Sequence, residues 1–101
     1  MNILEAIDAL KSGQFVKTKD YVNHDIFYVL GHIEPIGSDE VLLFEVDDME
    51  YRQSRPTSFK EIPWAHRDTV NMNSVVKGDF TISSKEEVLE AMQKAWDKYH
   101  A

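Results

Sequence analysis

Cysteine is absent from the 101 residues of this sequence. Its absence excludes disulfide bonds, thiolate catalysis and cysteine-ligated zinc or iron–sulfur centres, and it fits a reducing compartment such as the cytoplasm. Long apolar segments are also lacking, because the longest unbroken run, Ile26 to Leu30, falls far short of the ~20 residues that span a bilayer. The start of the chain carries no basic and apolar signal region. We therefore expect a soluble, cytoplasmic protein.

Positive charge is scarce. Eleven Lys and Arg residues stand against 18 Asp and Glu residues, which gives a net charge of −7. This balance argues against direct binding to nucleic acid, which depends on clustered Lys and Arg. The deficit is concentrated in residues 20–51, which hold nine acids and no Lys or Arg. A surface of one charge sign departs from the mixed charges typical of soluble domains. It is either a solvated face or a binding surface.

Hydrophobic spacing predicts the elements of one domain covering residues 1–101. A helix is expected over residues 3–12, capped by Asn2 and ended by Gly13, and a strand over residues 15–22. Residues 26–33 and 41–46 predict a β-hairpin, and residues 51–74 a loop-rich connection. One or two short strands, with a turn or bulge at Gly78, are suggested by Val75, Val76, Phe80 and Ile82. Ser84 and Glu87 form the pattern of a capping box, so a closing helix should begin at Lys85.

These elements indicate an α+β fold, with an antiparallel sheet of four or five strands and both terminal helices packed on one face. The middle of the hairpin is apolar on both faces, so both must be covered. Two short helices are not expected to cover both, which leaves a second layer of sheet or another copy of the chain. We therefore expect a homodimer or other homo-oligomer formed through an uncovered face around Leu43.

The acids of the hairpin should gather at its two ends. With a turn centred near Gly37, Glu34 would lie opposite Glu40, and His24 opposite Glu50. Such a surface would attract a basic partner, such as a nucleic-acid-binding protein, by mimicking nucleic acid. We therefore predict a non-catalytic binding protein without cofactors, whose partner-binding residues are Asp25, Glu34, Asp39, Glu40, Glu45, Asp47, Asp48 and Glu50.

Two alternatives stay open. Aromatic and Arg side chains can stack a base and clamp a phosphate, so a nucleotide sponge would use Tyr51, Arg52, Trp64 and Arg67. Oxygen and imidazole ligands suit magnesium, manganese or zinc, so a metal-dependent enzyme would use His24, Asp25, Asp48 and Glu50. The sequence carries no established catalytic or metal-binding motif, which makes an enzyme the least expected class.

Residues 3–17, ILEAIDALKSGQFVK, resemble the helix–Gly–strand start of small phage proteins that include the second Thoeris anti-defence family. The resemblance implies a phage-encoded inhibitor of a host defence system. Proteins of that kind sequester cyclic-nucleotide signals, often as oligomers. The sequence departs from the family at Tyr21, where a Trp usually follows the first strand, and Trp96-Asp97 lies inside a predicted helix instead of forming a closing motif. No ligand residue is carried over.

Overall fold

The computed structural model describes residues 1–19, 22–33, 38–66 and 72–101. Its α-helices are α1 (Ile3–Lys11), α2 (Met72–Lys77) and α3 (Lys85–Tyr99). Its strands are β1 (Phe15–Lys19), β2 (Asp25–Ile33), β3 (Ser38–Glu45), β4 (Ala65–His66) and β5 (Thr81–Ser83). Two 3-10 helices, η1 (Val46–Tyr51) and η2 (Phe59–Glu61), lie between β3 and β4 along the chain. In the described part of the chain, no helix is long and apolar enough to cross a membrane.

The five strands form one antiparallel sheet in the order β4-β3-β2-β1-β5. The α+β class and the antiparallel sheet are therefore as predicted. The longest pairing is the β2–β3 hairpin, which extends from Ile26 opposite Glu45 to Ile33 opposite Ser38. Gly31 lies in this pairing, and a Cβ at that position would overlap the Leu42 side chain, so a larger residue there would require that side chain to move.

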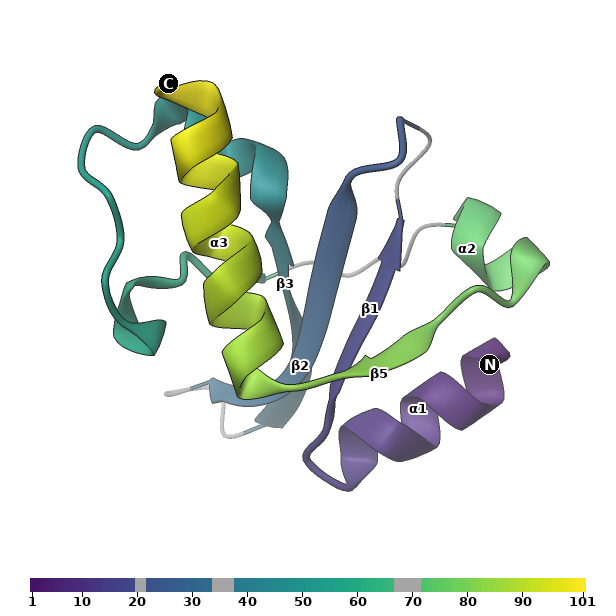
Figure 1. Ribbon diagram of the computed structural model, residues 1–101. Coiled ribbons are helices and arrows are strands. Elements are labelled where there is room, and N and C mark those ends of the chain that lie inside the picture. Colours follow the sequence, from purple (N-terminus) through teal and green to yellow (C-terminus); the bar gives the residue numbers. More distant parts are fainter. Residues whose placement is uncertain (20–21, 34–37, 67–71) are drawn as a thin grey trace.

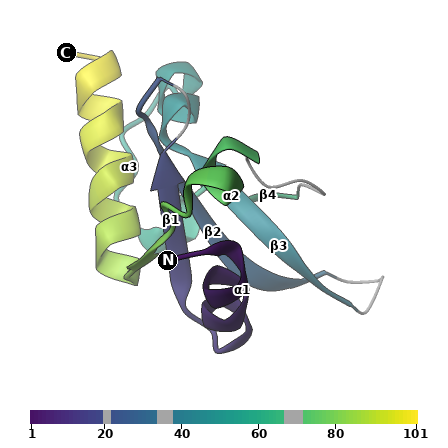
Figure 2. The same cartoon turned by 90° about the vertical axis from the view of Figure 1, so that its right-hand side faces the viewer.

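The two terminal helices lie on opposite faces of the sheet, which corrects the expectation that they share one face. Figure 1 shows α3 on one side of β2 and β3, with α1 and α2 on the other, and the quarter turn in Figure 2 agrees. Strand alternation explains this arrangement, because adjacent residues of one strand point to opposite faces. Tyr28 and Leu43 pack towards α1, whereas Phe27 and Phe44 pack towards α3.

The α1 face is built around a helix with a complete set of terminal signals. Asn2 accepts a hydrogen bond from the backbone N–H of Glu5, and the Glu5 carboxylate accepts one from the N–H of Asn2, which forms a capping box. Gly13 has a φ of 85°, the left-handed conformation expected at a helix stop. Buried α1 residues pack on a sheet core made of Val16, Ile26, Tyr28, Leu43 and Phe80.

The α3 face holds the larger aromatic side chains. Val88, Met92 and Ala95 of α3 pack with Phe27 and Phe44, whose rings stack at 6.3 Å. The residues between β3 and β4 contribute Met49, Phe59, Ile62 and Trp64 to the same cluster. These side chains cover the part of this face that α3 does not reach. Leu43 is only 7% exposed on the other face, so the argument for self-association through this residue is wrong.

Several predicted elements differ in detail. Val75 and Val76 belong to α2, so only Thr81–Ser83 forms the strand expected in this region. The connection 51–74 is not entirely loop, since it contains η2, β4 and the start of α2. Ser84 caps α3 through the N–H of Glu87. The Glu87 carboxylate bonds to Ser83 instead of reaching back to the cap, so the predicted box is only half formed.

The hairpin register also differs from the prediction. Glu40 lies opposite Gly31 instead of opposite Glu34. Glu50 lies on η1, outside the sheet, so it does not pair with His24 as predicted. Like charges therefore do not face each other in the described part of the hairpin. The observed pairing is shifted by three residues from the predicted one, since Glu45 lies opposite Ile26, and β3 ends at Glu45, where the chain turns into η1. Glu34 is outside the described residues.

Candidate acidic docking surface at the end of the hairpin

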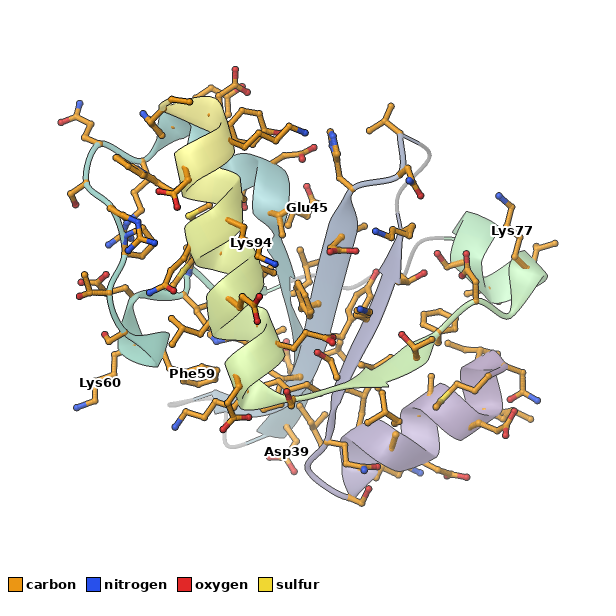
Figure 3. All side chains as sticks on the ribbon, in the orientation of Figure 1. Asp39, Glu45, Phe59, Lys60, Lys77 and Lys94 are labelled. Carbon is orange, nitrogen blue, oxygen red and sulfur yellow. The ribbon has the colours of Figure 1, made fainter. Side chains whose placement is uncertain are left out.

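The predicted partner-binding acids separate into two groups at the ends of β3. Asp39 and Glu40 lie at the beginning of the strand, near the hairpin connection. Glu45 ends the strand, and Asp47, Asp48 and Glu50 follow on η1. Figure 3 labels Asp39 and Glu45 at opposite ends of β3, about 20 Å apart at the usual rise per residue. The richer group is therefore the one at η1, where Asp25 also begins β2.

The helix η1 is fixed to the body of the protein by its buried side. Met49 is 1% exposed and lies in the α3 cluster. Its carbonyl oxygen lies 3.0 Å from Nε2 of His100, and the indole N–H of Trp96 donates to the carbonyl of Arg52 directly after η1, also at 3.0 Å. These contacts come from the last turn of α3, so the segment is held at both its middle and its end.

Asp47 has a structural role within this arrangement. Its Oδ1 accepts a hydrogen bond from the Tyr99 hydroxyl at 3.1 Å and lies 2.6 Å from Nδ1 of His24. The carboxylate thereby joins η1 to both α3 and the turn before β2. Asp25 is similarly engaged, because its Oδ1 lies 2.7 Å from the Lys19 ammonium. Two of the predicted partner-binding acids are therefore engaged within the chain, Asp47 with His24 and Tyr99 and Asp25 with Lys19.

The opposite side of η1 faces solvent. Asp48 and Glu50 are exposed, and the Tyr51 side chain is 81% exposed. We call these three residues the acidic corner. Tyr51 ends η1 directly after Glu50, and an exposed Tyr ring can bury a large apolar area against a partner. The corner is thus a rigid surface that combines negative charge with an aromatic ring.

The nucleotide-binding set predicted from the sequence is only partly assembled. Tyr51 and Arg52 line a shallow pocket of about 360 Å³ together with Asp48, Met49 and Pro63. Trp64 lies elsewhere, in an aromatic cluster with Phe15, Phe44 and Phe59 at centroid distances of 6.1 to 6.4 Å. Arg67 is outside the described residues. The structure therefore brings together Tyr51 and Arg52 but not Trp64.

The Arg52 guanidinium is engaged within the fold. It donates to the carbonyl oxygens of Ser54 and Glu61, and its Nη2 lies 3.3 Å from the Glu61 carboxylate. The carboxylate of Asp48 in the same pocket would also repel a phosphate. This pocket is therefore poorly suited to an anionic ligand.

The metal-binding alternative receives no geometric support. Over residues 1–19, 22–33, 38–66 and 72–101, no group of three or more His, Asp or Glu side chains is placed to hold a metal ion. His24 and Asp25 lie at the start of β2, whereas Asp48 and Glu50 lie on η1. Asp47, absent from the predicted metal set, is the residue that bonds to His24.

Comparison of the chain with protein-family models, with curated proteins and with solved structures found no match. The function is therefore argued from the geometry of the chain alone. Sequence reasoning located the acids of the corner but assigned Tyr51 to a different site. The signal for combining them was the adjacency of Tyr51 to Glu50 at the end of one short helix.

Proposed function

We propose that this chain is a non-catalytic binding protein that docks its acidic corner on a basic protein partner. The observation that carries the proposal is the exposure of Asp48, Glu50 and Tyr51 on a helix that buried Met49 holds in place. A fixed surface loses little conformational entropy on binding. The carboxylates would accelerate association electrostatically, and the Tyr ring would supply the buried contact that slows dissociation.

The nature of the partner follows from the charge. Nucleic-acid-binding proteins are the basic proteins that an acidic surface can engage by occupying the site of a phosphate backbone. The resemblance of residues 3–17 to phage anti-defence proteins makes a host defence protein the first partner to examine, and the lack of cysteine directs the search to the cytoplasm.

The proposal is tested with the double reversal Asp48→Lys/Glu50→Lys. Proteins captured from host extract on the parent chain are identified, purified and measured individually for their association rates. The reversal should slow association by about tenfold or more at low salt, and the difference should shrink as salt rises, because ions screen exposed charges.

A matched control separates the effect of the acidic corner on association from the effect of the total net charge. Asp8→Lys/Glu86→Lys makes the same change in net charge at two exposed acids outside η1. This control should alter the association rate much less than the corner reversal does. Equal effects of the two variants, with folding verified by thermal melting, would show that the corner is only a solvated surface. Tyr51→Ala should mainly raise the dissociation rate.

The nucleotide sponge predicted from the sequence is the weaker candidate, because Tyr51 and Arg52 share a pocket but Asp48 lines it and Arg52 is engaged with Glu61. Cyclic nucleotides would then raise the melting temperature of the chain in proportion to the logarithm of their concentration. Arg52→Gln should abolish that rise. An unchanged melting temperature at millimolar nucleotide would eliminate this candidate and leave the docking proposal intact.

A further inference from the structure

A groove of about 420 Å³ lies between α3 and the sheet, on the side of α3 that faces β1 and β2. Four of the eleven Lys and Arg residues of the chain line it, which are Lys17, Lys19, Lys94 and Lys98. Figure 3 shows the Lys94 side chain leaving α3 on the side that faces the sheet. Three carboxylates, Asp25, Glu87 and Glu90, line it as well, so the four lysines exceed the acids by one in a chain whose net charge is −7. We call it the lysine groove.

The sequence explains why the groove exists. Along α3, the residues that face it include Ala91 and Ala95, whose small side chains leave the space between helix and sheet unfilled. Across from them, the alternation of β1 places Lys17 and Lys19 on the α3 face, where apolar residues would have closed the gap. The apolar packing between α3 and the sheet therefore ends at Phe27, and charged side chains border the remaining space.

Each of three lysines has a carboxylate beside it. Lys17 Nζ lies 3.1 Å from Glu87, Lys19 Nζ 2.7 Å from Asp25, and Lys94 Nζ 2.8 Å from Glu90. These pairs are partly or largely exposed, and such pairs add little stability. Their main effect is to orient the ammonium groups along the groove. A ligand with several negative oxygens can replace the carboxylates as the partner of these ammonium groups at small cost.

The lysines of the groove approach it from two elements. Hydrogen bonding to Glu90, followed by the charge of that carboxylate, raises the pKa of Lys94, which keeps its ammonium fully charged at neutral pH. Lys94 and Lys98 from α3 and Lys17 and Lys19 from β1 place ammonium groups on two sides of the groove, among the carboxylates of Asp25, Glu87 and Glu90. A small, multiply charged oxyanion can contact both sides at once.

We propose that the lysine groove binds a small organic phosphate that carries two or more phosphate groups. The volume suits a small molecule. A nucleic acid strand is a poorer fit, because its length would take it past the groove into the acids at the adjoining end of the hairpin. His24, which lines the groove, bonds to Asp47 of that acidic end. This site is separate from the acidic corner and does not depend on the proposed docking function.

Titration calorimetry with tripolyphosphate as the probe tests the site. Lys94→Gln/Lys98→Gln removes two charges from the α3 side of the groove, and should weaken binding at least about fivefold. The matched control Lys60→Gln/Lys77→Gln removes two exposed charges elsewhere, on η2 and α2, as Figure 3 shows. The control should change the affinity less than about twofold.

Two further variants distinguish a shaped site from general attraction. Glu90→Gln removes a repelling carboxylate that competes for Lys94, so it should tighten binding of the probe. Ala91→Leu fills the groove without a change of charge and should weaken binding. Folding of every variant is verified by thermal melting.

Three results would overturn the proposal. The first is the lack of tripolyphosphate binding by the parent chain at about 10 mM. The second is equal weakening by the two lysine double variants. The third is tighter binding of a single-stranded DNA oligonucleotide than of tripolyphosphate, which would indicate a nucleic acid site instead.

Discussion

At the scale of single residues, the sequence identified which side chains are chemically notable but not what they contact. Asp47 was predicted to meet a partner, yet it bonds to His24 and Tyr99. Trp64 was a candidate for base stacking, yet it packs on Phe15 and Phe44. These contacts join residues far apart in the chain, which spacing along one sequence does not reveal. Gly13 and Ser84 were predicted well, because caps depend on their immediate neighbours.

A buried polar contact offers a test at this scale. Thr18 is 2% exposed, and its hydroxyl lies 2.6 Å from Ser74 Oγ and 3.0 Å from the Asp79 carboxylate. Thr18→Val should lower the free energy of unfolding by about 1–3 kcal/mol, because it leaves buried polar groups unsatisfied. Chemical denaturation measures the change. Thr81→Val on an exposed strand position should cost under about 0.5 kcal/mol, and an equal cost would refute the role given to Thr18.

At the scale of elements, prediction succeeded where the hydrophobic residues of a segment followed a single helix or strand period. The closing helix begins at Lys85 as predicted, and the hairpin strands lie within two or three residues of their predicted bounds. The strand predicted at Val75 and Val76 is wrong, because two β-branched residues form a strand only where a neighbouring strand pairs with them. Here Ser74 bonds to the carbonyl of Lys19 and fixes a short helix against β1 instead. Tertiary contact overrides local preference in this segment.

The start of α3 gives a prediction that depends on pH. The Ser83 hydroxyl donates to Glu87 and, together with Lys17, holds the pKa of Glu87 below its ordinary value of 4.5. A carboxyl whose pKa is lower in the folded chain stabilises the fold above its unfolded pKa, and this stabilisation is lost as pH falls through the folded pKa.

Ser83→Ala should therefore raise the pKa of Glu87, which NMR titration of its side chain would measure. The variant should be less stable than the parent at pH 7, by under about 1 kcal/mol because the pair is partly exposed. This difference should decrease in acid. A pKa that stays unchanged in the variant would mean that Ser83 is not the main cause.

At the scale of the whole molecule, the apolar residues on both faces of the hairpin correctly predicted that each face is packed against another layer of the structure. The prediction that a second copy supplies one of them was wrong in its reasoning. Residues 51–74 were interpreted as a loop-rich connection, and within it Phe59, Ile62 and Trp64 cover the sheet beside α3. An irregular segment without a period gives no sign of the face it will cover. The lysine groove was missed for another reason, because it forms only where β1 and α3, which lie far apart in the sequence, come together.

Hydrogen exchange should reflect this layered arrangement. Strand β2 has a neighbour on each side and a covering layer on each face, so its amides should exchange slowest. The edge strands β4 and β5 are short and should exchange sooner. Mass spectrometry or NMR of the exchanging chain measures both. Protection of β5 equal to that of β2 would contradict the arrangement.

The position of α3 has a consequence for synthesis of the chain on the ribosome. Phe27 and Phe44 are translated some forty or more residues before Val88 and Met92, the residues that bury them. Strand β1 likewise waits for Thr81–Ser83 before its second edge is paired. Until then, the nascent hairpin exposes aromatic side chains and an open edge, which are the features that chaperones recognise and that promote aggregation. Truncation before Lys85 would make that transient state permanent, so a product shortened there should accumulate in the insoluble fraction.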